Sequence, residues 1–122
     1  MVSDQPARDA STAEPTVVAH ENGRLAYAEY GDADGDPVVL FHGTPGSRLL
    51  GALFETVAAE HGVRLLAIDR PGYGSSEPWR SRSITDAGAY TTAVFDDADT
   101  ETATLLAFSG GCPQAIAAAA TH

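Results

Sequence analysis

The residues best suited to catalysis lie around a serine near the end of the sequence. The segment Ala107–Gly111 (AFSGG) follows an apolar run and precedes an alanine-rich stretch, so it predicts a strand that turns directly into a helix at Ser109. A tight corner would strain the backbone of Ser109 and hold its hydroxyl above the sheet, as a nucleophile requires. The N–H of Gly110 would face the same space and could stabilise an oxyanion. Ser109 could instead serve only as a helix N-cap, which is a common role for serine.

Two further loops rich in Gly, Pro and Ser are expected to converge on this corner. His42–Ser47 (HGTPGS) and Asp69–Ser76 (DRPGYGSS) each follow a continuous apolar run, and ligands of parallel α/β sheets bind at the carboxyl ends of strands. Pro45 has no N–H, so a second oxyanion donor in the first loop would be Thr44 or Gly43. For His42, a packed and hydrogen-bonded imidazole is favoured over a catalytic role. A cis peptide bond before Pro45 is compatible with the sequence.

These loops need strands and helices that place them, and the pattern supplies both. Asn22-Gly23 is a strong signal for a hairpin that joins two β-like segments. Apolar runs predict strands buried on both faces, and spaced apolar residues predict helices between them. The predicted strands are 16–19, 24–30, 38–41, 64–68 and 103–108, and the predicted helices are 49–58, 83–98 and 114–120. The sequence therefore predicts an α/β fold with an opening β-hairpin, then βαβαβα with a mostly parallel sheet.

Composition limits the classes of partner. The 122 residues hold 17 acids and seven arginines but no lysine, so the formal net charge is -10. This balance disfavours nucleic acid and anionic membranes as partners, and the missing lysine excludes the common phosphate-binding loop. The acidic charge balance also favours a protein from a salt-loving cell, with an ordinary acidic protein as the alternative. We expect no cofactor, no metal site at the single Cys112, no membrane-spanning segment, and by default a cytoplasmic location. Cys112 is expected to pack as a small hydrophobic residue.

The three loops together resemble the α/β-hydrolase superfamily, over residues 16–122 and in the family's order. The resemblance implies that Ser109 is the nucleophile, that Thr44 and Gly110 donate the oxyanion hydrogen bonds, and that the substrate is a small ester or amide. His42–Gly46 is also similar to the corresponding loop of proline iminopeptidases, whereas a Ser rather than an Asp at the corner argues against the dehalogenase and epoxide-hydrolase branches. The residues implied to support the site are His42, Gly43, Gly46, Asp69, Gly72, Gly74 and Gly111.

The sequence departs from that family after the corner. Family order places an acid and then a histidine downstream of the nucleophile, but the thirteen residues that follow Ser109 contain no acid, and a helix would carry His122 about 20 Å away. We therefore expect residues 16–122 to form the N-terminal half of the fold, incomplete at its C-terminal side, after a disordered leader at 1–15. Two hypotheses follow: part of a serine hydrolase, or an inactive remnant or interaction module. The strand 103–108 would be an exposed edge, open to a missing C-terminal half or to self-association.

Overall fold

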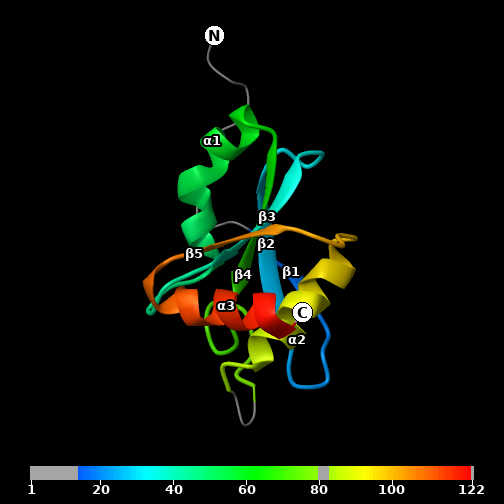
Figure 1. Ribbon diagram of the computed structural model, residues 1–122, viewed down its shortest axis with the longest axis vertical. Coiled ribbons are helices and arrows are strands. Elements are labelled where there is room, and N and C mark those ends of the chain that lie inside the picture. The colour runs from blue at the N-terminus through cyan, green and yellow to red at the C-terminus, as the bar shows by residue number, and fades with distance from the viewer. Residues whose placement is uncertain (1–13, 80–82, 122) are drawn as a thin grey trace.

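The structure is a computed structural model that describes residues 14–79 and 83–121 (Figure 1). The predicted leader lies outside the described residues except for Glu14 and Pro15, and His122 lies outside them too. The strands are β1 (Thr16–Val18), β2 (Leu25–Gly31), β3 (Asp36–Phe41), β4 (Val63–Asp69) and β5 (Thr104–Ala107). The helices are η2 (Arg48–Phe54), α1 (Glu55–Glu60), α2 (Asp86–Asp97), η3 (Ser109–Gly111) and α3 (Cys112–Thr121), where η marks a 3-10 helix.

The five strands form one sheet in the order β1-β2-β4-β3-β5. The opening hairpin pairs β1 with β2 in antiparallel register, Thr16 opposite Tyr27, and its turn uses Gly23 at a φ of 136°. β2 is antiparallel to β4, whereas β3 runs parallel to both β4 and β5. The predicted fold class is confirmed, and the parallel strands β3, β4 and β5 direct their carboxyl ends to one edge of the sheet.

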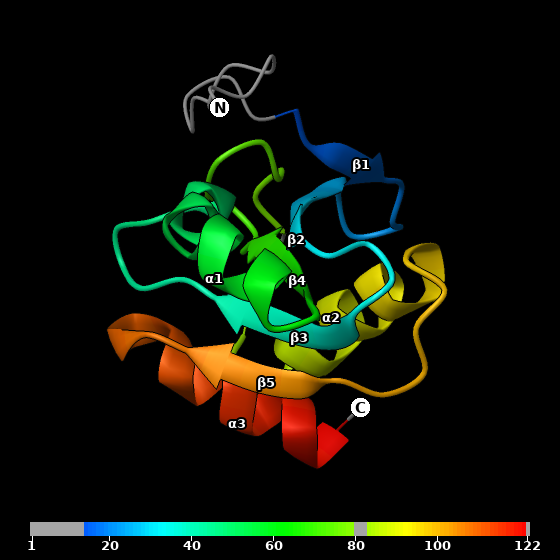
Figure 2. The same cartoon turned by 90° about the horizontal axis from the view of Figure 1, so that it is seen from above.

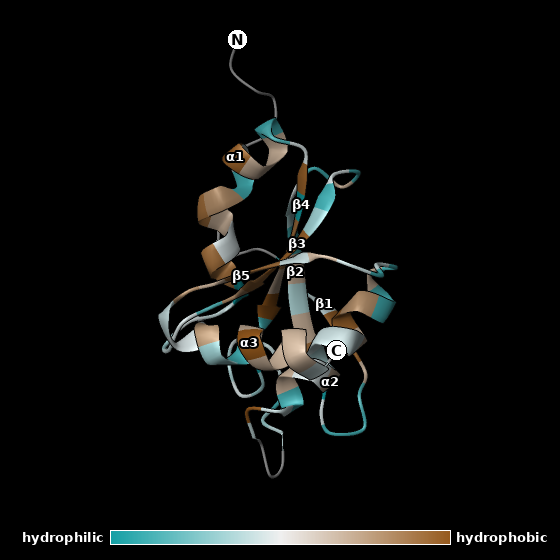
Figure 3. Cartoon of the chain, viewed as in Figure 1, coloured by the Kyte–Doolittle hydropathy of each residue, from teal (hydrophilic) through white to brown (hydrophobic). Residues whose placement is uncertain are grey.

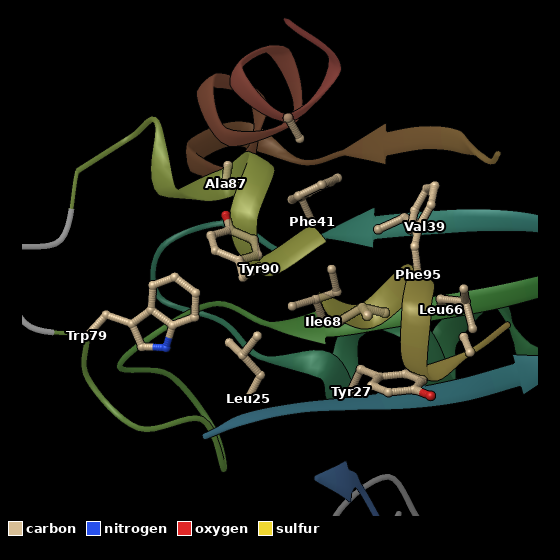
Figure 4. Close-up of a cluster of buried hydrophobic side chains, with 13 residues drawn as sticks. Leu25, Tyr27, Val39, Phe41, Leu66, Ile68, Trp79, Ala87, Tyr90 and Phe95 are labelled. Atoms are coloured by element: carbon tan, nitrogen blue, oxygen red, sulfur yellow. The ribbon is translucent and has the colours of Figure 1, made fainter. Parts of the chain in front are cut away.

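Hydrophobic side chains fill both faces of this sheet because its central strands alternate between two layers. On one face, η2 and α1 cover a cluster that includes Tyr30, Leu40 and Leu65. On the other face, α2 and α3 pack against each other and cover a larger cluster, shown in Figure 4. Figure 2 shows α1 on one side of the sheet and α2 with α3 on the other. This three-layer arrangement fixes the strand ends from which the loops project.

The helix expected at 49–58 begins differently from the prediction. Its first part is the 3-10 helix η2, which the hydroxyl of Ser47 caps by accepting a hydrogen bond from the N–H of Leu49 at 3.2 Å. Gly51 in η2 lies so close to the sheet that an added Cβ would meet the ring of Tyr30 at 2.5 Å. The chain then continues as α1 and turns at Gly62 with a φ of 66°, as expected for a glycine that ends a helix.

The last strand is more exposed than predicted. β5 lies at the edge of the sheet and pairs only with β3, so its apolar run is not buried on both faces. Leu106 and the adjacent Phe108 are each 40% exposed, and Ile116 on α3 is 71% exposed. The expectation of a buried strand was therefore wrong, while the expectation of an edge strand is confirmed. Figure 3 shows hydrophobic residues on α1 and α3 as well as in the strands.

No helix within 14–79 and 83–121 has the length and apolar character that a bilayer span requires.

Candidate active site

The corner at Ser109 has the backbone geometry that its sequence predicts. β5 ends at Ala107, and Ser109 has a φ of 44°, in the left-handed region that non-glycine residues rarely adopt. Two backbone bonds hold the corner: the N–H of Phe108 donates to the carbonyl of Phe41 at 3.1 Å, and the N–H of Gly111 donates to that of Phe108 at 2.7 Å. The chain therefore turns from strand to helix in a single strained step.

Gly111 allows this corner to press against the neighbouring strand. A Cβ on Gly111 would lie 2.5 Å from the carbonyl oxygens of both Phe41 and His42. Real Cβ atoms essentially never approach other atoms so closely. The requirement for a small residue two positions after Ser109 is thus a direct consequence of the contact between the corner and the end of β3.

The side chain of Ser109 does not cap the helix. The N-cap position of η3 is Phe108, and no side chain donates or accepts a capping bond there. Within the part of the chain that the structure describes, the hydroxyl of Ser109 makes no hydrogen bond, and the residue is exposed. The alternative interpretation of Ser109 as an N-cap was therefore wrong, and its hydroxyl is available to an incoming ligand.

The backbone N–H groups of Thr44 and Gly110 lie where the loop 42–47 meets the corner. A Cβ built on Gly110 would be 3.2 Å from the backbone nitrogen of Thr44, and one on Gly43 would be 3.6 Å from the Cβ of Ser109. The loop 42–47 therefore abuts the corner, with a cis bond between Thr44 and Pro45. Among the described residues, neither the N–H of Thr44 nor that of Gly110 donates to another group. Both are free to donate to a ligand oxygen.

His42 is a packed imidazole, as its sequence context favoured. The side chain is 1% exposed; its Nδ1 lies 2.7 Å from the carbonyl oxygen of Gly43, and its Nε2 accepts the N–H of Arg70 at 3.0 Å. This pattern requires the neutral ring with its proton on Nδ1. Burial lowers the pKa of His42 further than its hydrogen bond to Gly43 raises it. Since backbone groups occupy both nitrogens, His42 is not placed to take a proton from Ser109.

Arg70 joins the three loops, and sequence reasoning missed it. Its guanidinium donates to the carbonyl oxygen of Gly110 at 3.2 Å and to the hydroxyl oxygen of Thr44, and it lies over the ring of Tyr73 at 4.9 Å from the ring centroid. The ring of Tyr73 in turn meets His42 edge-on. One side chain thus contacts both Thr44 and Gly110, the residues expected to supply the oxyanion hydrogen bonds. The signal in the sequence was weak: a single charge directly after a buried strand, in a loop at the site.

A second missed residue, Arg48, holds the loop that follows β4. Asp69 is fully buried and accepts three hydrogen bonds: from the backbone N–H of Arg48 at 2.6 Å, from its guanidinium at 2.7 Å, and from the N–H of Ser75 at 2.9 Å. Gly74, at a φ of 53°, leaves room for this carboxylate, because an added Cβ would lie 2.3 Å from it. Asp69 therefore supports the loop rather than acting on a substrate.

The remaining predicted glycines fall where the loops turn. Gly72 has a φ of 88°, which strongly favours glycine. A Cβ on Gly46 would lie 2.6 Å from the carbonyl oxygen of Gly43, so this residue keeps the first loop compact. All the predicted site residues therefore lie in the three loops that meet at the corner.

The described residues hold no base for Ser109. Three histidines fall within them, and only His42 lies in these loops. His20 stacks on Trp79 beside the hairpin turn, and His61 follows α1 at the other end of the sheet. No group of three metal-binding side chains is found in residues 14–79 and 83–121. Cys112 is exposed, so its expected packing role was wrong.

Comparisons with known proteins agree with this architecture. A family model for the alpha/beta hydrolase fold matches residues 36–122. A haloalkane dehalogenase from Psychrobacter cryohalolentis is 37% identical over 60 residues, which are 49% of this chain and 20% of the dehalogenase. The chain is also similar to an epoxide hydrolase from an endophytic Streptomyces, at 31% identity and a TM-score of 0.73, over 88% of this chain and 33% of the other. An esterase from Exiguobacterium antarcticum is 25% identical at a TM-score of 0.78, over 89% and 41%.

The chain therefore spans less than half the length of each of these proteins. The matched residues 36–122 contain all three loops and exceed half of the chain. Because this match coincides with the strand order and the serine corner described above, the chain belongs to the α/β-hydrolase fold family.

Proposed function

We propose that Ser109 is the nucleophile of a hydrolase that cleaves ester or amide bonds of small molecules. One observation carries the proposal: an exposed serine, held at a left-handed φ of 44°, lies beside two backbone N–H groups with no partner among the described residues. An acyl-transfer reaction needs this combination, because attack on a carbonyl carbon places negative charge on the carbonyl oxygen.

The proposed reaction has two halves. The Oγ of Ser109 attacks the carbonyl carbon, and the N–H groups of Thr44 and Gly110 donate to the oxyanion that forms. Loss of one such donor typically costs about 2.7–4 kcal/mol of transition-state stabilisation. The C–O or C–N bond then breaks, the leaving group departs with a proton, and water hydrolyses the acyl-serine. A base must accept the Ser109 proton, and residues outside the described part of the chain would supply it, as the family order implies.

The identity of residue 109 favours acyl substrates. The resemblance assigns an Asp at this position to the dehalogenase and epoxide-hydrolase branches, whereas this chain has Ser. The likeness to an esterase at 25% identity supports the same choice. The proposed substrates are therefore esters or amides, although a dehalogenase and epoxide hydrolases are among the similar proteins.

An inactive module is the second candidate, and the free edge of β5 favours it. This strand pairs on one side only and carries the exposed side chain of Leu106. In this alternative, the edge would accept a strand from a complementing polypeptide or from a second copy, and Ser109 would be unreactive.

A fluorophosphonate probe separates the two candidates. Applied to the full-length gene product, it should phosphonylate Ser109, and mass spectrometry should locate the adduct on the tryptic peptide that contains the corner. Ser109→Ala should abolish the adduct. Cys112→Ser is the matched control, because it alters an exposed nucleophile three residues away and should leave labelling unchanged. An unlabelled Ser109 in the full-length protein would contradict the proposal and favour the inactive module.

A further inference from the structure

A cavity of about 280 Å³ lies next to the proposed oxyanion donors. Thr44 and Gly110 form part of its wall, so it adjoins the space that the reacting carbonyl would occupy. Its other walls come from the loop after β4, from α2 and the segment before it, and from the start of α3, and they include Arg70, Tyr73, Tyr90 and Gln114. None of the nine lining residues is acidic, although the chain has 17 acids.

The cation in this wall has no anionic partner. Four arginines fall within the described residues, and three of them pair with a carboxylate: Arg24 with Glu77, Arg48 with Asp69, and Arg64 with Glu29. Arg70 is the exception within that part of the chain, although it is only 6% exposed. Burying a charge without a counter-ion is costly. The chain has 17 acidic residues, and carboxylates pair with the other three described arginines, so a partner for Arg70 could have been supplied. The exception therefore needs a reason.

Several N–H donors of the Arg70 guanidinium also have no acceptor among the described residues. Its two hydrogen bonds go to neutral acceptors, the carbonyl of Gly110 and the hydroxyl of Thr44, and its third contact is the face of the Tyr73 ring. A guanidinium has five N–H donors, so three remain, and the Nε of Arg70 is buried with no partner among the described groups. A carboxylate in the cavity would supply the missing charge and could accept from guanidinium N–H groups that make no other hydrogen bond.

We infer that this cavity binds a carboxylate of the substrate, so that the hydrolase acts on esters or amides that carry a free carboxylate close to the bond it cleaves. A monoanion fits better than a phosphate dianion, because Arg70 is the only basic residue among the described residues of the lining, and Pro71, Ile84 and two tyrosine rings give the rest an apolar character. Carboxylate binding stands on the cavity and Arg70 alone, whereas the substrate class also rests on the proposed role of Ser109.

A matched pair of probes tests this inference on the full-length gene product. Benzoate and benzamide have almost the same shape and differ in charge, and isothermal titration calorimetry gives the Kd of each. Benzoate should bind at least about tenfold more tightly than benzamide. The emission of Trp79, the single tryptophan, should change on binding, because its ring lies against that of Tyr90, at 5.9 Å between centroids (Figure 4). Equal affinities, or no benzoate binding, would overturn the inference without any variant.

Variants then assign the preference to Arg70. Arg70→Gln should remove it, Arg70→Lys should retain most of it by keeping the charge, and Arg24→Gln, the same change at an exposed arginine, should leave it unchanged. A preference that survives in Arg70→Gln would overturn the assignment. If Arg70→Gln does not fold, Arg70→Lys decides: a benzoate preference that is reduced but still present in Arg70→Lys and unaltered in Arg24→Gln would support the assignment, and a preference identical to the wild type in both variants would overturn it.

Failure of this inference is distinguishable from failure of the proposed function. Fluorophosphonate labelling of Ser109 without a benzoate preference would overturn the carboxylate site and leave the nucleophile standing. A benzoate preference that depends on Arg70, in a protein whose Ser109 is unreactive, would support the binding site but overturn its assignment to a substrate.

Discussion

Replacing Gly111 with alanine tests how the corner is built. The added Cβ would lie 2.5 Å from two carbonyl oxygens, and real Cβ atoms keep at least about 3.0 Å, so one side must move by at least about 0.5 Å. The obstacle is backbone at the end of β3, a central strand paired on both sides, and Phe41 and His42 there are almost completely buried. The corner must therefore move instead, and it carries Ser109 and Gly110 with it.

Two effects of Gly111→Ala can be sized. Overpacking against a rigid wall costs about 1–3 kcal/mol, and with a urea m-value of about 1–3 kcal/mol/M, a loss of 2 kcal/mol lowers the unfolding midpoint by roughly 1 M. Misplacing a reacting group by about 1 Å can cost on the order of a hundredfold in rate, so a shift of about half that size should slow fluorophosphonate labelling of Ser109 by about tenfold or more.

Gly62→Ala is the matched control. It makes the same substitution at a φ of 66° where no other atom lies within 4 Å, and it lies before β4, at the end of the sheet away from Ser109. Left-handed strain should cost it about 1–2 kcal/mol, a similar loss of stability, with labelling unchanged. Our account would be refuted if Gly111→Ala kept the wild-type midpoint and labelling rate, or if both variants lost labelling equally.

The charges and exposed groups of the fold give four more expected outcomes. Asp69→Ala should lower the free energy of unfolding by about 3–5 kcal/mol, because it deprives the buried Arg48 of its carboxylate; a urea-unfolding loss under about 1 kcal/mol would contradict this. Burial lowers the pKa of His42 below 6.5, so the unfolded chain binds its proton first, and the free energy of unfolding should fall as pH drops from about 6.5 through the lower folded pKa. His42→Asn should show a shallower pH dependence between about pH 7 and 5, and identical slopes would refute the assignment. Leu106→Lys should shift the 122-residue chain toward monomer in sedimentation velocity, because a charge on the edge strand opposes pairing; unchanged association would argue against β5 as the contact. Rising KCl should raise the melting temperature by screening the net charge of -10, whereas a flat or falling melting temperature would exclude salt adaptation.

Local sequence signals were sufficient to predict most of the fold. Asn22-Gly23 placed the hairpin, and the loops after β3, β4 and β5 were predicted to meet because parallel strands share one carboxyl edge. The small residues around Ser109 predicted a tight corner, and its left-handed φ agrees. These features depend on residues near one another in the chain, so their physical causes are visible in the sequence.

Long-range contacts could not be predicted in the same way. Arg70 binds Gly110, which is 40 positions away in the sequence, and Arg48 binds Asp69, which is 21 positions away. Neither pairing produces a periodic or local pattern in the sequence. The edge position of β5 was predicted, but the exposure of Leu106 was missed, because an apolar run is the same in sequence whether or not both faces of the strand are covered. The 3-10 start of the first helix was not predicted either, and Gly51 within it lies against Tyr30, which is also a tertiary contact.

A crystal structure of the full-length protein after reaction with a fluorophosphonate tests the central claim most directly. We predict a covalent bond from the Oγ of Ser109 to phosphorus, a positive φ at Ser109, and the phosphoryl oxygen within about 3 Å of the backbone nitrogens of both Thr44 and Gly110. A structure with Ser109 in ordinary helical geometry, or with that oxygen directed away from the 42–47 loop, would contradict the assignment of this corner as a catalytic site.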